Sequence, residues 1–259
     1  MNKIIAICNQ KGGVGKTTTT FNLGAALTLK QAKKVLLIDL DPQANLSEYL
    51  CFIPDDKPTM TNLITETAQN SIINSDIVAN SIRYNEKNKL HYIPSDINLA
   101  NAEISMTTAL ARETILKRIL SDDITNQFDY VLIDCLPSLG ILLINALTAA
   151  NEMIIPVQTQ KFSMDGLQAL NSLYNQIRST INPNLNLTGV LATMVDNTTV
   201  SKNALNTLSD KYDSIFKTLI HKSVEAAKSS ESGTALCQTK NRLGEEYTLL
   251  SEEILKKLE

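Results

Sequence analysis

Residues 3–20 read KIIAICNQKGGVGKTTTT, an apolar run that leads through a glycine-rich loop into a helical pattern. A strand, a glycine loop and a helix in this order are the context in which a phosphate-binding loop occurs. Gly12, Gly13 and Gly15 let backbone N–H groups turn toward phosphate oxygens, and the helix adds the positive end of its dipole. The stretch therefore predicts an α/β fold with a nucleotide site after its first strand.

Side chains in the same loop have the chemistry that a nucleoside triphosphate requires. Lys16 can reach the β and γ phosphates, and the Thr17 hydroxyl can ligate Mg²⁺. The standard spacing of such loops needs glycine at position 10, where this chain has Gln10, so only the final GKT matches it. A second lysine, Lys11, is left without a role in one phosphate loop. The predicted nucleotide-contacting residues are Lys11, Gly12, Gly13, Val14, Gly15, Lys16, Thr17 and Thr18.

Beyond the loop, short β-branched runs alternate with longer helical patterns. The expected strands are 3–8, 35–39, 90–94, 130–134, 153–157, 187–194 and 215–220, and most are apolar throughout, as parallel strands buried on both faces are. The expected helices are 16–29, 107–120, 139–149, 164–181, 201–212 and 243–258, with short helices and loops in the polar stretch 54–89. This alternation predicts a doubly wound, mostly parallel sheet with helices on both faces, formed by residues 1–259 as one domain.

Composition limits the classes of protein that the chain can belong to. The 259 residues are 43% hydrophobic and 20% charged, with a net charge of −3, so no global attraction to nucleic acid or anionic lipid is expected. Four cysteines without a CxxC pair argue against a disulfide framework or a zinc site and fit a reducing cytosol. We expect no signal peptide and no membrane span, since no stretch approaches ~20 apolar residues.

Three aspartates follow buried strands. Asp39 and Asp41 lie in VLLIDLDPQANLS (35–47), and Asp134 lies in YVLIDCLPSLG (130–140). Because the carboxyl ends of parallel strands meet at one edge of the sheet, these carboxylates are expected beside the phosphate loop. We predict that Thr17 and Asp134 hold Mg²⁺, Asp134 acting through water. The alternative for Asp39 is a helix cap at the end of its strand.

The cysteine that follows the last of these carboxylates, Cys135, is interpreted as a packed residue and not as a nucleophile. No histidine or other base lies near it in the sequence.

The motifs together resemble those of the ParA/MinD family of P-loop ATPases. KGGVGKT (11–17) is similar to the deviant Walker A motif of that family, LIDLDPQ to its switch I, and the stretch 130–140 to its Walker B and switch II. Leu136 stands where the family commonly has a proline. The resemblance implies ATP and Mg²⁺ as ligands and an ATP-sandwich homodimer. Lys11 would touch the phosphates of the partner, and Lys16 would serve its own nucleotide. Asp41 would position or polarise the attacking water, and Asp39 would lie nearer the metal and its water shell, as part of the Mg²⁺ site.

The resemblance extends to other parts of the chain. NALTAANEMIIPV (145–157) and FSMDGL (162–167) are similar to a strand and a helix at the dimer-facing edge of the family. TMVDNT (193–198) and IHKSVEAAK (220–228) correspond to segments beside the adenine base, which implies contacts from Met194 and Lys222. The usual Pro-Arg-Asn of the second segment is His-Lys-Ser here.

Within the family, the chain looks most like the short ParA/Soj-type partition ATPases. The resemblance implies non-specific DNA binding by the ATP dimer, and weak hydrolysis that a centromere-binding, ParB-like partner stimulates. From residue 201 onward, nine basic residues accompany nine acidic ones, so DNA binding depends on how they segregate in space. Glu225 stands where chromosomal relatives have an arginine and would oppose binding. The candidate DNA contacts are Lys202, Lys222, Lys228, Lys240 and Arg242.

Rival functions make different demands on the sequence. A MinD-like membrane ATPase would end in a basic amphipathic helix, whereas LLSEEILKKLE (249–259) has mixed charge. A nitrogenase-iron-protein relative would need cysteine pairs. A positioning ATPase for protein clusters that does not bind DNA, and a metabolic P-loop ligase, both stay open. The expected location is the cytoplasm, in association with the nucleoid.

Overall fold

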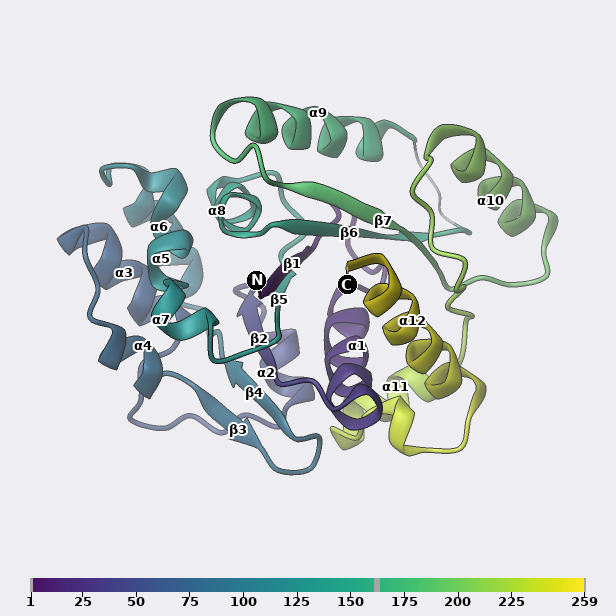
Figure 1. The fold of residues 1–259 in the computed structure, drawn as a ribbon, viewed down its shortest axis with the longest axis horizontal. Coiled ribbons are helices and arrows are strands. Elements are labelled where there is room, and N and C mark those ends of the chain that lie inside the picture. Colours follow the sequence, from purple (N-terminus) through teal and green to yellow (C-terminus); the bar gives the residue numbers. More distant parts are fainter. Residues whose placement is uncertain (1, 161–163, 259) are drawn as a thin grey trace.

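A computed structural model of the chain describes residues 2–160 and 164–258 and shows one seven-stranded sheet (Figure 1). The strand order is β3-β4-β2-β5-β1-β6-β7, and every neighbouring pair is parallel except β3 and β4. The strands are β1 (Lys3–Ile7), β2 (Val35–Leu40), β3 (Arg83–Asn85), β4 (Leu90–Ile93), β5 (Tyr130–Cys135), β6 (Glu152–Gln158) and β7 (Asn186–Thr193). The predicted doubly wound, mostly parallel sheet is confirmed.

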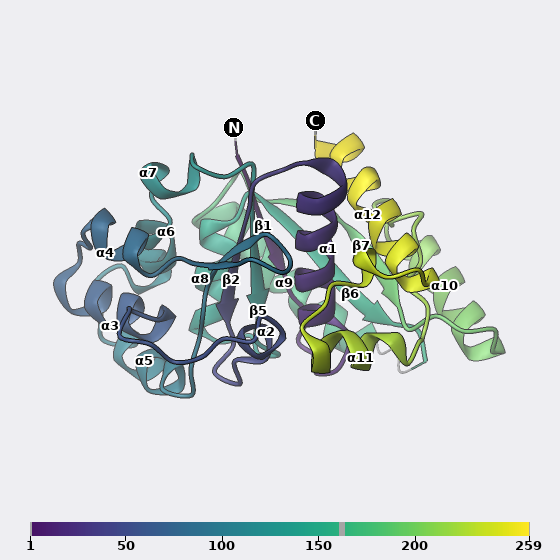
Figure 2. The ribbon, with the colours of Figure 1, turned by 90° about the horizontal axis from the view of Figure 1, so that it is seen from below.

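Helices connect the strands and cover both faces of the sheet (Figures 1 and 2). The helices are α1 (Lys16–Gln31), α2 (Asn45–Tyr49), α3 (Met60–Asn70), α4 (Ser75–Asn80), α5 (Leu99–Met106), α6 (Ile115–Ile119), α7 (Asp122–Thr125), α8 (Ile141–Ala149), α9 (Met164–Thr180), α10 (Thr199–Lys211), α11 (Glu225–Ser232) and α12 (Arg242–Leu258). Two short 3-10 turns, η1 (Arg112–Thr114) and η2 (Leu236–Gln238), lie between them.

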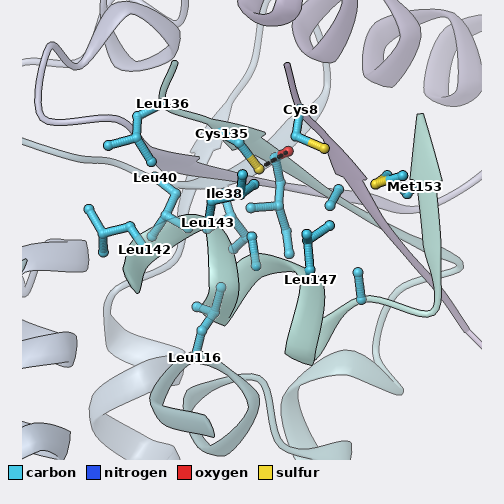
Figure 3. Packing of buried hydrophobic residues seen from close by; sticks show 14 of the residues in the cluster. Cys8, Ile38, Leu40, Leu116, Cys135, Leu136, Leu142, Leu143, Leu147 and Met153 are labelled. Atoms are coloured by element: carbon cyan, nitrogen blue, oxygen red, sulfur yellow. Dashed lines mark hydrogen bonds between the residues drawn. The ribbon is translucent and has the colours of Figure 1, made fainter. Parts of the chain in front are cut away.

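Successive residues of each strand enter two separate cores. Ile5 and Ile7 of β1 pack with α1 and α12, whereas Ala6 and Cys8 pack on the other face with α8 and its neighbours. Figure 3 shows Cys8 and Cys135 side by side in this second core, above the leucines of α8. Cys135 is 1% exposed, so its interpretation as a packed residue is confirmed, and burial raises the pKa of its thiol well above the ordinary value.

The prediction of a strand at 215–220 is wrong. The N–H groups of Phe216 and Ile220 reach carbonyls of β7, but two N–H groups between them bond the carboxylate of Glu253 on α12. The segment therefore alternates between two partners and makes only isolated bridges to the sheet. An acceptor on a distant helix replaces the strand ladder that its β-branched sequence indicates.

The single helix predicted over 107–120 is also wrong. Ala111 adopts a left-handed conformation (φ 50°), and η1 and α6 follow it separately. The buried side chain of Asn145 on α8 explains the break: it donates to Arg112 O at 2.8 Å and accepts from Leu116 N at 3.0 Å. The stretch 54–89 does form the expected short helices, but it also contributes the antiparallel edge strand β3, which the sequence analysis did not predict.

Candidate nucleotide site

Three adjacent strands bring the glycine loop and two carboxylates to one edge of the sheet. Ile7, the last residue of β1, lies opposite Asp134 in β5, and Asp134 lies opposite Asp39 in β2. The loop that follows β1 therefore begins directly beside both carboxylates. This is the position at which ligands bind to open parallel sheets.

The loop is held open by backbone conformation and by side-chain anchors. Gly13 and Gly15 have φ values of 72° and 88°, in the left-handed region that glycine tolerates. Asn9 donates to Pro156 O at 2.7 Å and accepts from the loop N–H of residue 11 at 2.9 Å. At the other end, the Thr193 hydroxyl donates to Val14 O at 2.8 Å. Both ends of the loop are thus fixed to the strands β6 and β7.

The two lysines of the loop differ in their surroundings. Lys16 is only 7% exposed, and its Nζ donates to the carbonyl of Lys11 at 3.2 Å. Its charge also lowers the pKa of Asp134, which places it beside the carboxylates. Lys11 has intermediate exposure at the start of the loop. This difference fits the prediction that Lys16 serves its own nucleotide and Lys11 that of a second copy. The contact of Lys11 with a second copy stays a prediction.

Asp134 has the properties of a metal-site carboxylate. It is 1% exposed, and its Oδ1 accepts a hydrogen bond from the Thr20 hydroxyl at 3.2 Å. Its Oδ2 is buried without a hydrogen-bond partner among residues 2–160 and 164–258. Burial, and next the charge of Asp39, raise the pKa of Asp134 to about 8, while the Thr17 hydroxyl lowers it. A buried, unpaired carboxylate oxygen beside a hydroxyl fits a Mg²⁺ ion.

Asp39 makes the contacts of a cap. Its Oδ2 accepts from the N–H and the hydroxyl of Ser47, at 2.8 and 2.7 Å, and its Oδ1 accepts from Asp41 N at 3.2 Å. Burial raises its pKa to about 6, and the Ser47 bonds act in the opposite direction. The capping alternative is therefore what the direct contacts show, because Asp39 holds the first turn of α2. A water-mediated contact with Mg²⁺ stays a prediction.

Asp41 occupies the tight turn between β2 and α2. Its Oδ1 accepts from Gln43 N at 2.9 Å, and its carbonyl accepts from Ala44 N at 2.9 Å. The turn fixes the side chain, which is 7% exposed, just beyond the carboxyl end of β2. The arrangement places a carboxylate where the sequence predicts the water-positioning group.

A cavity of about 260 Å³ adjoins the glycine loop. Its walls are the end of β7, the chain before α11, α11 itself and α12, and it is lined by Gly15, Thr18, Thr193, Met194, Ile220, His221, Lys222, Ser223, Ala226, Ala227, Leu243 and Tyr247. Met194 and Lys222, both predicted beside the base, are thus brought together next to Gly15. The sequence analysis missed the wall from α12. Only the apolar stripe of the last helix could have suggested Leu243 and Tyr247.

Two of the five predicted DNA contacts are paired with carboxylates. Lys228 pairs with Glu225 at 2.7 Å, and Arg242 pairs with Glu246 at 2.7 Å. The other three lie on separate segments: Lys202 in α10, Lys222 at the cavity and Lys240 before α12. Residues 162–163, part of the predicted dimer-facing segment, lie outside the described residues.

Comparisons with known proteins agree with this geometry. Residues 2–187 match the profile of the AAA domain family. The sporulation initiation inhibitor protein Soj of Bacillus subtilis is 36% identical over 258 residues, covering 98% of each chain. The chromosome partitioning protein ParA of Myxococcus xanthus is 31% identical, covering 99% of this chain and 89% of the relative.

Two solved structures share the fold over nearly its whole length. A putative plasmid partition protein of Borrelia burgdorferi, bound to AMPPNP, superimposes with a TM-score of 0.82 at 26% identity and covers 100% of both chains. A cobyrinic acid a,c-diamide synthase of Mycobacterium smegmatis, with bound ADP and magnesium, has a TM-score of 0.82 at 32% identity, covering 99% of this chain and 95% of its own.

In the described part of the chain, no helix combines the length and the apolar character needed to cross a membrane. The relatives match a chain in which the glycine loop begins beside the strand-end carboxylates and adjoins the cavity. The chain belongs to the AAA domain family and, within it, to the ParA/Soj type of P-loop ATPases with a deviant Walker A motif.

Proposed function

We propose that this protein is a partition ATPase, with residues 1–259 acting as one domain in an ATP-dependent cycle. Two copies of the protein bind ATP and Mg²⁺ and form a sandwich dimer, which binds DNA non-specifically. A centromere-binding, ParB-like partner then stimulates ATP hydrolysis, which returns the protein to the start of the cycle. The observation that supports this most is the unpaired Oδ2 of Asp134 beside a glycine loop that opens into the 260 Å³ cavity. The similarity to proteins named Soj and ParA supports partition as the purpose of the cycle.

Nucleotide binding follows from the shape of the site. The base enters the mostly apolar cavity between Met194 and Tyr247, where burial of its aromatic face favours binding. The triphosphate lies along residues 12–18, where backbone N–H groups and the α1 N-terminus favour its negative charge. Lys16 neutralises the β and γ phosphates.

The donor set fits a magnesium ion. Thr17 contributes its hydroxyl, and Asp134 contributes its unpaired oxygen through water. Asp39, already bonded to Ser47, orders the water shell from its strand end. When bound, Mg²⁺ neutralises charge on the phosphates.

Hydrolysis requires a positioned water and an added cation. Asp41 orients the attacking water from the turn after β2. Lys11 of a second copy places positive charge where negative charge grows at the γ-phosphate, as an arginine finger does. Because these groups complete the site only in the dimer, turnover is weak without a partner protein. The proposed place of action is the cytoplasm, on the nucleoid.

DNA binding rests on lysines such as Lys202 and Lys240, which form no ion pair among residues 2–160 and 164–258. Glu225 already neutralises Lys228 and would face phosphate unfavourably. This local neutrality favours one rival, a positioning ATPase for protein clusters that does not bind DNA. A second rival follows from the similarity to a structure named as a synthase. ATP turnover in the absence of any small-molecule acceptor would argue against ligase chemistry.

The test uses the Asp41→Ala variant, which we expect to bind ATP and remain dimeric without turnover. Fluorescence anisotropy of random-sequence duplex DNA is measured with and without ATP–Mg²⁺ across a salt series. ATP-dependent binding that weakens steeply with salt supports the proposal, and the slope counts the phosphates neutralised. An ATP dimer in light scattering that leaves the DNA free supports the protein-positioning alternative. Normal turnover by Asp41→Ala would remove Asp41 from the mechanism.

A further inference from the structure

We propose that Glu246 on α12 is a positioning residue for the base-binding wall of the nucleotide cavity. The inference rests on the proposed function, because it assumes that the cavity receives the base of ATP. Glu246 does not line the cavity itself. It acts on residues 220–223, the chain segment that does.

Glu246 is a buried carboxylate with three donors. It is 8% exposed. Its Oε2 accepts from His221 N at 2.8 Å, and its Oε1 accepts from His221 Nδ1 at 2.7 Å and from Arg242 Nε at 2.7 Å. Because the ionised carboxylate has no proton to give, Nδ1 of His221 is the donor. Bonds of this charge-assisted kind are stronger than neutral ones and fix both the backbone and the ring of His221.

The opposite side of the same segment is attached to β7, through Ala192, and to Val195 just beyond it. Val195 N donates to Ile220 O at 3.0 Å, and Lys222 N donates to Val195 O at 3.1 Å. His221 lies between these two bonds and directs its own N–H to Glu246. The wall of the cavity is therefore suspended between the end of β7 and α12. Without Glu246, the N–H and the ring of His221 would lose their acceptor on α12.

The position of Glu246 on α12 couples two walls of the cavity. Leu243 precedes it by three residues and Tyr247 follows it directly, and both line the cavity. Glu246 thus holds the cavity wall formed by α12 at a fixed distance from the wall formed by residues 220–223. Loss of this joint would change the fit of a base and leave the glycine loop untouched, since that loop is anchored separately by Asn9 and Thr193.

The same helix supplies a matched control. Glu253 lies seven residues further on, and its oxygens accept from Lys217 N at 2.8 Å and from Thr218 N at 3.0 Å. It bonds the residues just before this segment, also through backbone N–H groups, but neither of its partners lines the nucleotide cavity. A general loss of stability from a missing carboxylate would be shared by both positions, whereas a loss of base binding would not.

The experiment compares Glu246→Ala with Glu253→Ala by isothermal titration calorimetry. Each protein is titrated with ATP–Mg²⁺ and with tripolyphosphate–Mg²⁺, which has no base. We expect Glu246→Ala to weaken ATP binding about ten-fold and leave tripolyphosphate binding unchanged. Glu253→Ala is expected to change neither. Glu246→Gln should lose less ATP affinity, because its amide oxygen still accepts from the His221 N–H. It provides the same comparison should the alanine variant fail to fold.

Two outcomes overturn the inference. Unchanged ATP affinity in both Glu246 variants would show that the wall does not depend on this carboxylate. Equal losses for ATP and tripolyphosphate would assign Glu246 a general structural role. If the wild-type protein binds ATP no more tightly than tripolyphosphate, the base contributes nothing to the affinity. That result would instead overturn the assignment of the cavity in the proposed function.

Discussion

At the scale of single residues, the site contains an electrostatic conflict that a cation relieves. Asp39 and Asp134 are neighbours on adjacent strands, both buried, and the charge of Asp39 raises the pKa of Asp134. Such a pair is unfavourable in its ionised form unless a positive group lies nearby. The same arrangement that costs stability without ligand therefore favours binding of Mg²⁺.

This conflict predicts how stability depends on pH. The pKa of Asp134 rises from its ordinary value of 3.8 to about 8, and that of Asp39 to about 6, so the folded protein holds these protons more tightly than the unfolded chain. The stabilisation that comes from protonating these two carboxylates is fully present below pH 3.8. It is lost as the pH rises through about 6 and then about 8.

Thermal denaturation of the nucleotide-free protein between about pH 5 and pH 8.5 measures this dependence. Asp134→Asn, which cannot ionise, should show a shallower decline over the same interval. Asp123→Asn, at an exposed carboxylate of α7, is the control and should follow the wild type. Parallel curves for wild type and Asp134→Asn would contradict the prediction.

A second prediction at this scale concerns the phosphate lysine. Lys16→Ala removes the cation that is buried at the end of the glycine loop, so ATP binding should fall below detection in calorimetry. Lys202→Ala, on exposed α10, serves as the control and should bind ATP normally. Retained nucleotide affinity in Lys16→Ala would refute the assignment of the loop.

At the scale of elements, α2 is the helix that depends most on its neighbours. Five residues are too few for a helix that is stable by itself. Ser47 binds Asp39 at one end, and at the other the Tyr49 hydroxyl lies 2.9 Å from that of Thr18, with the Tyr49 ring against Phe21. The helix thus joins the strand-end carboxylate to the helix that begins the nucleotide site.

Ser47→Ala tests this dependence. The change removes the hydroxyl bond to a buried carboxylate and the acceptor for Ser95 N, so the free energy of unfolding should fall by about 1–3 kcal/mol. Urea denaturation measures the loss. Ser105→Ala, at a half-buried serine whose hydroxyl donates to Ala102 O within α5, is the control and should cost less. Equal effects at the two serines would mean that α2 does not depend on Asp39.

At the scale of the whole molecule, α12 connects the helix after the glycine loop with the chain segment that lines the other side of the cavity. It packs on α1, lines the cavity with Leu243 and Tyr247, and bonds the chain segment beside β7 through Glu246 and Glu253 (Figures 1 and 2). Its close approach to η2 needs glycine, because a Cβ at Gly244 would lie 2.2 Å from the backbone oxygen of Leu236.

Gly244→Ala should therefore displace α12 and lower the free energy of unfolding by roughly 1–3 kcal/mol, with weaker ATP binding as a consequence. Chemical denaturation and calorimetry measure the two effects. Glu245→Ala, exposed on the same turn, is the control and should leave ATP binding unchanged. A fully stable Gly244→Ala protein with normal ATP affinity would contradict the role of this contact.

Local patterns in the sequence predicted the features that local chemistry determines. The apolar runs indicated six strands of the sheet, because a parallel strand buried on both faces needs apolar residues throughout. The glycine loop followed from its GKT and from the glycines that left-handed backbone requires. Asp39 and Asp134 could be placed beside it because parallel strands end at the same edge.

Contacts between distant segments decided what the sequence could not. Glu253 took the N–H groups of the expected strand 215–220, and Asn145 interrupted the expected helix at 107–120. The same reason applies to the cavity, whose walls come from the glycine loop and from segments between Thr193 and Tyr247, and to the bond between Glu246 and His221. By itself, the sequence determined the sheet, the phosphate loop and its carboxylates. Tertiary structure alone decided how α12 closes the cavity, because the acceptor for the His221 N–H lies on that distant helix.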